Sequence, residues 1–377
     1  MTTTSERASE PMLRRAAKRV SQSVFDGSRL RVVLLVDVYD GAQQQFLEAY
    51  EQMGKQVASV PGHVSDQLCQ SIENPSQWLI TSEWESAPPF LAWVNSEEHV
   101  QMVQPMHSCI RDTRSLRFHI VRETGGEAAR SGAAERRLQN SPRIGDGVIR
   151  HALTFTVKPG SEQQVAKILS GYASPEARVD DSTRLCRTSL FMHGNRVVRA
   201  IEVRGDLLAA LRHVSRQPEV RAVEEAINPF LEEHRDLDDQ ESARVFFTRA
   251  ALPAVHHVTA DDATEVERHA LYYQARPGLG MKLAERLAQH DERAAGDPHG
   301  PMLRSTVYER DDVVVRLVDV REGFDADPFL ALGLDPAQAA ELTTLVDGSS
   351  PRAADPAHLL TLARMDLVTD RRSAPES

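Results

Sequence analysis

The feature that most constrains this chain of 377 residues is a pattern that recurs three times. A short apolar run ends at Gly41, and corresponding runs end at Gly160 and Gly278, at offsets of 119 and 118 residues. Residues 196–204 and 313–321 also align and share five identities. This period is far longer than the ~20–50 residues of solenoid repeats, so it predicts one domain fold used three times.

Hydrophobic spacing predicts the elements within each copy. The order is β-α-β-β-α-β, which is typical of a ferredoxin-like, split βαβ fold. The sequence therefore predicts an α+β protein of three such repeats with antiparallel sheets. In the first copy the expected elements are a strand at 30–38, a helix at 43–58, strands at 62–70 and 77–85, a helical region at 88–106 and a strand at 115–122. In the other copies the first helices are expected at 161–172 and 279–290, and the last strands at 245–248 and 359–365.

A sheet with helices on one face leaves its other face uncovered, and an exposed apolar sheet face promotes aggregation. We therefore expect the second and third copies to pair their sheets within one chain, in the manner of a dimeric α/β barrel. The first copy is expected to pair with its counterpart in a second chain, which makes the protein a homodimer.

Composition sets the expected domain boundaries. Residues 124–146 combine glycines with alternating charges and predict a linker, and a shorter junction is expected near 252–262. The predicted organisation is a flexible N-terminus (1–27), a first domain (28–123), the linker (124–146), two further repeats (147–250 and 251–366) and a disordered tail (367–377).

Charge and hydropathy argue against two classes of partner. A net charge of −11 with interspersed acids and bases disfavours nucleic-acid binding. No run reaches the ~20 apolar residues of a membrane span, and the first residues lack the apolar centre of a signal peptide. Three cysteines without a CxxC spacing fit a reducing compartment. We therefore expect a cytoplasmic protein that binds neither nucleic acid nor membranes.

The motifs of metal and cofactor sites are absent from the sequence. Its 14 histidines form no HxH or HExxH motif, and no dinucleotide loop, GxxxxGK[ST] loop or serine nucleophile elbow occurs. The sequence thus predicts no metal and no bound cofactor.

All three tryptophans lie in the first copy, at Trp78, Trp84 and Trp93. Strand side chains alternate between faces, so Trp78 and Trp84 share one face of the strand expected at 77–85. Tryptophans on such a strand serve either as core or as a platform for a flat ligand. The residues alone leave both readings open, and Trp93 in its helical stretch is expected to pack.

Residues 28–123 resemble the antibiotic biosynthesis monooxygenase family. The resemblance is carried by Pro61-Gly62 before the second strand, by the Asn74-Pro75 turn and by Glu83-Trp84-Glu85-Ser86 at the end of the third strand. Residues 147–366 resemble the SchA/CurD-like domain attached to such monooxygenases in aromatic polyketide and spore-pigment pathways. Both repeats there carry an Arg-His-Ala-Leu motif, at 150–153 and 268–271.

The resemblance implies a cofactor-independent monooxygenase that hydroxylates a polycyclic aromatic polyketide or converts it to a quinone, with dioxygen as co-substrate. Asn74 and Trp78 are similar to the Asn/Trp pair of quinone-forming members, and Trp84 matches an aromatic position. The substrate would stack between Trp78 and Trp84, and Asn74 would donate its amide hydrogens to an enolate or peroxy intermediate.

The first copy departs from the family in its second helical region. Quinone-forming relatives use an arginine there, whereas residues 95–99 read Asn-Ser-Glu-Glu-His and the nearest arginine is Arg111. We therefore expect a histidine to act as the base. His99 is the first choice and His107 the second; His119 is also available, and His63 and Trp93 are assigned to substrate binding.

Two other functions remain open. The chain is alternatively a polyketide cyclase or aromatase, or a non-catalytic partner of a polyketide-tailoring enzyme. The active pocket is alternatively in the second and third copies, where His151 and His269 recur at equivalent positions with structural use as the main reading. The arginines there either meet an anionic phenolate or form a solvated face: Arg187, Arg196, Arg199, Arg304 and Arg316.

Overall fold

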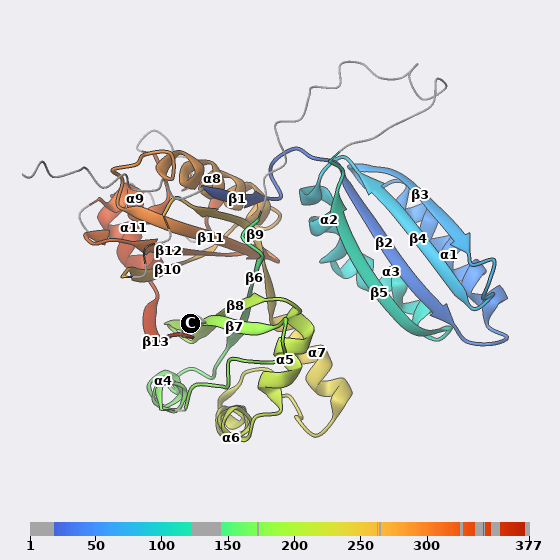
Figure 1. The fold of residues 1–377 in the computed structure, drawn as a ribbon, viewed down its shortest axis with the longest axis horizontal. Helices are drawn as coiled ribbons and strands as arrows, with labels where there is room; N and C mark the ends of the chain where they lie inside the picture. Colours follow the sequence, from blue (N-terminus) through green and yellow to red (C-terminus); the bar gives the residue numbers. More distant parts are fainter. Residues whose placement is uncertain are drawn as a thin grey trace, which may run out of the picture.

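The computed structural model describes residues 19–121 and 145–373, apart from residues 172, 262, 264, 325–326, 336–341, 343 and 348–354. These residues form a four-stranded and a nine-stranded sheet, both antiparallel, with helices packed on them (Figure 1). The prediction of an α+β fold with antiparallel sheets is therefore confirmed.

The N-terminal domain contains the smaller sheet, in the order β3-β4-β2-β5. This order is that of a ferredoxin-like fold, with the first and third strands of the domain at its centre. Its elements are β2 (Leu30–Val38), α1 (Gln43–Val57), β3 (His63–Gln70), β4 (Gln77–Trp84), α2 (Ala87–Val94), α3 (Glu97–His107) and β5 (Ile110–His119).

Local sequence explains the elements of this domain. Leu30, Val32 and Val36 alternate along β2 and are buried beneath the helices. The helical region predicted as one unit divides in two, because the Ser96 side chain accepts a hydrogen bond from the His99 backbone N–H and starts a new helix. The last strand begins at Ile110, five residues earlier than predicted.

The C-terminal region has two halves that follow the same order of elements. The first half contains β6 (Val148–Thr156), α4 (Glu162–Ser170), β7 (Arg184–His193), β8 (Arg196–Arg204), α5 (Leu207–Ser215), α6 (Pro218–Ile227), the 3₁₀ helix η2 (Asn228–Phe230), α7 (Gln240–Ala250) and β9 (Ala251–Thr259). The second contains β10 (Glu267–Gln274), α8 (Gly280–Ala294), β11 (Met302–Arg310), β12 (Val313–Val320), α9 (Pro328–Leu332), α11 (Pro356–Ala363) and β13 (Asp366–Arg372).

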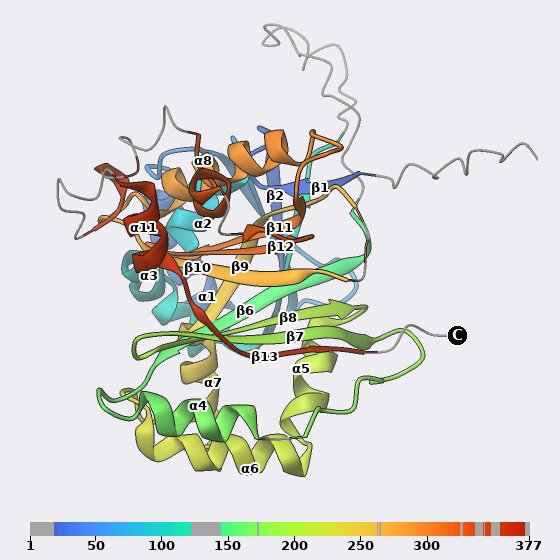
Figure 2. The ribbon, with the colours of Figure 1, turned by 90° about the vertical axis from the view of Figure 1, so that its left-hand side faces the viewer.

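The last strand of each half crosses to the other half. Residues 251–253 of β9 pair with β6 of their own half, and residues 254–259 pair with β11. In the same way Arg364 bridges to Leu271 of β10, after which β13 pairs with β7. The strand order β10-β12-β11-β9-β6-β8-β7-β13 therefore returns to β10 and closes a barrel within one chain (Figure 2).

Helices cover the outside of this barrel on two opposite sides. Helices α8, α9 and α11 bury one apolar core, and α4, α6 and α7 bury another (Figure 2). Between the half-sheets lies a third apolar cluster that includes Phe191, Tyr308 and Leu317. Side chains alternate between the two faces of a strand, so a residue two positions along the strand from any member of this cluster also points into the barrel.

Four sequence-based boundaries are wrong. Residues 245–248, predicted as a last strand, lie in α7. Residues 359–365, also predicted as a last strand, form the end of α11 and the two residues after it. Phe246 and Ala250 of α7 pack at helical spacing on the core beneath them, and the Asp355 carboxylate caps α11. The junction expected at 252–262 is mostly β9, a strand inside the sheet, and the tail expected from 367 is mostly β13.

A short strand, β1 (Val20–Ser23), joins the N-terminal domain to the barrel. It pairs with β9, so the flexible N-terminus predicted at 1–27 is ordered at least over this strand. Leu91 of α2 also packs against the core beneath α8. Residues 122–144, which include most of the predicted linker, lie outside the described residues. No helix within the described residues has the length and apolar character needed to cross a membrane.

Candidate active site

An aromatic cluster lies between β4 and the helices α2 and α3 of the N-terminal domain. The fully buried Trp84 ring lies 5.2 Å from the Trp93 ring, nearly parallel to it, and 5.4 Å from the Phe90 ring. Pro88 and Pro89 at the start of α2 fix the turn after β4, so that Phe90 and Trp93 face the strand. The cluster brings together two predicted site residues, Trp84 and Trp93.

Two predicted histidines extend this cluster at its two ends. The His63 ring meets Trp84 edge-on at 5.2 Å, and the His99 ring meets Trp93 edge-on at 4.3 Å. Neither the indole Nε1 of Trp93 nor Nδ1 of His99 has a hydrogen-bond partner among the described residues. Buried polar atoms are normally paired. Nε1 of Trp78 and Nε2 of His63 likewise make no hydrogen bond among the described residues.

His63 has a carboxylate next to its ring, although its Nε2 makes no hydrogen bond among the described residues. Its Nε2 lies 3.3 Å from an oxygen of Asp66, and the Tyr50 hydroxyl donates a 2.6 Å hydrogen bond to the other oxygen of that carboxylate. Burial and this acidic neighbour raise the pKa of Tyr50, so its proton stays in place. A carboxylate beside the imidazole stabilises the imidazolium that forms when the base takes a proton.

His99, the first choice as base, is less suited to that role. Burial, together with the neighbouring His107, lowers the pKa of His99 to about 4. A group with such a low pKa is a weak proton acceptor at neutral pH. His107 is exposed at the end of α3, and His119 lies 3.9 Å from Asp26 on the surface.

Arg117 of β5 was missed by the sequence analysis. Its guanidinium carbon lies 5.4 Å from the centre of the Phe90 ring, and no carboxylate pairs with it among the described residues. Arg117 pairs in register with Val32 of β2, whose side chain is buried on the helical side of the sheet. Cross-strand register could have placed the arginine on this side. Arg117 thus places a cation beside the aromatic cluster.

Asn74 and Trp78 lie at the opposite end of β4 from this cluster. Trp78 packs on Phe46 of α1, at 5.4 Å, and belongs to a different part of the core from Trp84. The exposed Asn74 side chain accepts hydrogen bonds from the Ser76 N–H and hydroxyl and so forms the turn. The two tryptophans share a face as predicted, but their six-residue spacing of ~20 Å prevents them from enclosing one ligand.

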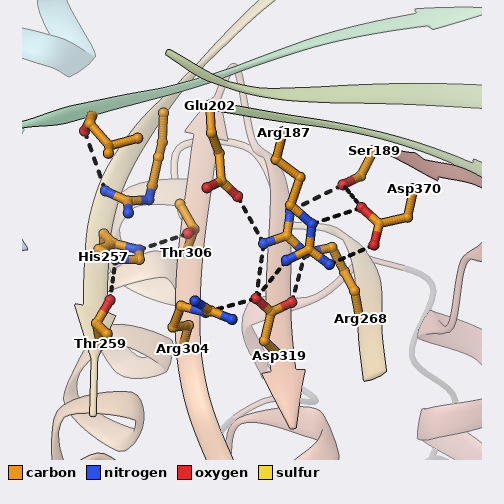
Figure 3. A network of polar contacts seen from close by, with 12 residues as sticks. Arg187, Ser189, Glu202, His257, Thr259, Arg268, Arg304, Thr306, Asp319 and Asp370 are labelled. Carbon is orange, nitrogen blue, oxygen red and sulfur yellow. Dashed lines mark hydrogen bonds and ion pairs between the residues drawn. The ribbon is translucent and has the colours of Figure 1, made fainter. Parts of the chain in front are cut away.

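Within the part of the chain that the structure describes, four of the five arginines named above in the C-terminal region form ion pairs, and Arg196 is the exception. Arg187, Arg268 and Arg304 surround the Asp319 carboxylate, and Asp370 of β13 pairs with Arg187 (Figure 3). These guanidinium groups hold the pKa of Asp319 well below its usual range. Arg199 and Arg316 pair with Glu224 and Asp291, so the reading of these arginines as a solvated face is wrong. Arg196 lines a cavity.

Histidines of the C-terminal region pack against rings or form hydrogen bonds within the barrel. The His269 ring stacks on Phe324 at 3.9 Å, and His151 is half-buried on β6. His257 accepts or donates hydrogen bonds with Thr306 and Thr259 inside the barrel (Figure 3), so the pair at 256–257 lies in a strand and not in a junction. Within the described residues, no three His, Cys, Asp or Glu side chains gather as metal ligands would.

Two family models match this chain. Residues 29–105 match the antibiotic biosynthesis monooxygenase family, and residues 148–260 match the SchA/CurD-like domain. Among solved structures, SnoaB, a cofactor-independent oxygenase from Streptomyces nogalater, is 15% identical and has a TM-score of 0.24, with coverage of 26% of this chain and 96% of SnoaB. A putative antibiotic biosynthesis monooxygenase from Bordetella bronchiseptica is also 15% identical, with a TM-score of 0.23 and coverage of 24% of this chain and 96% of that one.

Full-length relatives are much more similar. Polyketide synthase CurD of Streptomyces cyaneus is 61% identical over 364 residues, which cover 94% of this chain and 98% of the relative. Protein SchA of Streptomyces halstedii is 58% identical over 365 residues, with coverage of 94% and 96%. The chain therefore belongs to the SchA/CurD family, with an antibiotic biosynthesis monooxygenase domain at its N-terminus.

Proposed function

We propose that the N-terminal domain is a cofactor-independent monooxygenase that oxidises a polycyclic aromatic polyketide with dioxygen in the cytoplasm. The observation that carries the proposal is the aromatic cluster of Trp84, Phe90 and Trp93, flanked by the His63–Asp66 pair and by Arg117. The match of residues 29–105 to a monooxygenase family supports it. The name of the relative Polyketide synthase CurD supports a polyketide as the substrate.

Each group has a role in this reaction. The ring of the substrate packs against Trp93, the partly exposed member of the cluster. His63 removes a phenolic proton, and Asp66 stabilises the imidazolium. Arg117 and the unpaired indole N–H of Trp93 stabilise the resulting anion, which is the kind of charge stabilisation that catalysis requires.

The electron balance favours quinone formation over hydroxylation. A ring CH₂ group and one dioxygen become a carbonyl and one water, so the substrate supplies all the electrons. Hydroxylation of an aromatic C–H would require an additional reductant. The deprotonated polyphenol itself reduces dioxygen, and the protein supplies binding, a base and a stabilised anion.

Oxygen uptake with 1,8-dihydroxyanthrone, corrected for the uncatalysed rate, tests this proposal. We expect uptake matched to quinone formation in the wild type. His63→Gln is expected to lower kcat by about 10²–10⁴-fold, because it removes the base. Trp93→Phe keeps the ring but removes the N–H donor, and is expected to lower kcat by about 10–100-fold.

Trp78→Phe is the matched control, because Trp78 lies on the same strand but packs on α1. It is expected to leave kcat within about threefold of the wild type. Loss of uptake in Trp78→Phe with full activity in His63→Gln would move the site to the Asn74 end of β4.

A cyclase or aromatase is the second candidate. It is favoured by the name of the relative CurD, a polyketide synthase, and by the His63–Asp66 pair, which suits proton transfer without oxygen. A dehydrated, cyclised product formed equally with and without oxygen would support it. No product from either reaction would favour the third reading, a partner of a polyketide-tailoring enzyme.

We also propose that two chains pair through the open face of the N-terminal sheet. This face carries Leu35 and Phe118, which are 43% and 51% exposed, and Arg31 and Glu83 form an ion pair at its edge. An apolar sheet face with a charged rim is typical of a protein interface. The proposed homodimer would cover the face that the barrel halves cover within one chain.

A further inference from the structure

One end of the C-terminal barrel contains a cavity of about 230 Å³. The cavity is lined by Thr154, Arg196 and Arg310. The opposite end of the barrel is closed by the charged network, which is the set of ion pairs around Asp319 that includes Arg268. Helix α7 forms its outer wall with Phe246, Arg249 and Ala250. An engineered cavity of ~150 Å³ accepts benzene, so this one has room for one or two aromatic rings.

The cavity combines apolar walls with cations. Phe155 and Phe246, whose rings lie 6.0 Å apart, line it together with the fully buried Leu252. The charged side chains of the lining are the cations Arg196, Arg249 and Arg310 and the anions Glu233 and Asp311. Such a lining matches a ligand that is aromatic on one side and anionic on the other.

Two of these arginines already have acidic partners, and the third does not. Arg249 lies 4.0 Å from Glu233, and Arg310 lies 3.2 Å from Asp311 and donates to backbone carbonyls. Arg196 donates to the Thr154 hydroxyl at 3.3 Å, and its guanidinium lies over the Tyr272 ring at 5.2 Å. No carboxylate pairs with Arg196 among the described residues.

A half-buried guanidinium without a counter-ion attracts an anion. Its planar fork binds a carboxylate, or a phenolate beside a carbonyl, through two parallel hydrogen bonds. The Tyr272 ring beneath it holds the fork in one orientation. A phosphate would also pair with Arg196, but it would leave the apolar walls in contact with water.

We propose that this barrel mouth is a second ligand site, which binds an aromatic carboxylate or phenolate of one or two rings through Arg196. The site is separate from the aromatic cluster of the N-terminal domain. Binding at this site therefore does not depend on the proposed oxygenase activity. A longer polycyclic ligand extends to solvent past Arg249, whose side chain is 67% exposed.

Calorimetric titration of the full chain with 1-hydroxy-2-naphthoate tests the proposal. We expect one binding event that the neutral methyl ester of the carboxylate does not reproduce. Arg196→Gln is expected to weaken binding by about 10–100-fold, because it removes a charge-assisted hydrogen-bond pair. The matched control is Arg212→Gln, which removes an exposed arginine of α5 and is expected to leave the affinity unchanged.

A second measurement uses the wild type alone. Phenylglyoxal modifies accessible arginines, and bound naphthoate is expected to protect Arg196 but not Arg212. Equal affinity for the ester, unchanged affinity in Arg196→Gln, or modification of Arg196 at saturating naphthoate would each overturn the proposal. His63→Gln is expected to retain this binding, which separates the site from the proposed oxygenase.

Discussion

Among single residues, Arg316 on β12 and Asp291 on α8 form a fully buried ion pair. Both side chains have no exposed surface, and their closest atoms are 2.7 Å apart. Arg316 also donates to the carbonyl of Ala331, and the Ser305 hydroxyl donates to Asp291. The guanidinium holds the pKa of Asp291 far below its usual range, so the pair remains charged in the core.

Removal of one partner from this pair is expected to be costly. Arg316→Met leaves the Asp291 carboxylate buried without its guanidinium, next to His290 and the Ser305 hydroxyl, and should lower the free energy of unfolding by about 3–5 kcal/mol. Arg221→Met is the control, because Arg221 pairs with Glu225 and Asp238 on the surface, and it should cost less than about 1 kcal/mol. Urea unfolding measures both; similar small losses would contradict the buried pair.

His151 predicts a dependence of stability on pH. Burial, and then the charge of Arg310, lowers its pKa to about 4 in the folded protein, against 6.5 for an ordinary histidine. Between these values the unfolded chain binds a proton that the folded chain does not, so the free energy of unfolding falls as the pH falls. Above pH ~6.5 the contribution is constant.

His151→Gln removes this contribution. From pH 7 to 5 the wild type is expected to lose about 1–2 kcal/mol more stability than the variant in urea unfolding. The control His234→Gln, at an exposed position, should keep the wild-type slope. An identical slope in His151→Gln would show that the histidine is not buried in its neutral form.

At the scale of elements, the exchanged strands hold the barrel together. β13 covers the edge of β7, and its Asp370 pairs with Arg187 in the charged network. β9 belongs to both half-sheets. Each half is therefore completed by a strand of the other, and the halves are expected to unfold together.

Truncation after Met365 tests this exchange. It removes β13, exposes the β7 edge and leaves Arg187 without one of its two carboxylates, so we expect aggregation or a large loss of stability. Truncation after Ser373 keeps β13 and is the matched control, with stability expected to be unchanged. Thermal unfolding compares them, and equal transitions would argue against a structural role for β13.

The limits of sequence reasoning show at the same elements. Apolar periodicity within 30–38, 43–58 and 77–85 predicted β2, α1 and β4 closely, because each element packs locally. The exchanged strands were missed because their partners lie in the other half of the barrel, at residues 304–308 for β9 and 187–192 for β13, and local periodicity carries no information on such pairing. The predicted site residues lie in two separate places for a similar reason. Spacing along β4 predicts that Trp78 and Trp84 share one face of the strand, but it does not predict which helix covers each of them.

For the whole molecule, the proposed homodimer forms through the open face of the N-terminal sheet. Leu35→Glu places a charge at the centre of this face and is expected to convert the proposed homodimer to a monomer. Leu208→Glu is the control, since Leu208 is 61% exposed on α5 of the barrel, and should leave the assembly unchanged. Sedimentation velocity gives the mass; a wild-type monomer would contradict the proposed pairing.

The mass of the product formed under ¹⁸O₂ tests whether the protein is a cofactor-independent monooxygenase. Wild-type protein, dialysed against chelator, would be incubated with 1,8-dihydroxyanthrone under labelled dioxygen. We expect a quinone with one labelled oxygen atom, in an amount that exceeds the protein-free control and is lost in His63→Gln. A quinone formed no faster than in the control, or a product without label, would contradict a cofactor-independent monooxygenase.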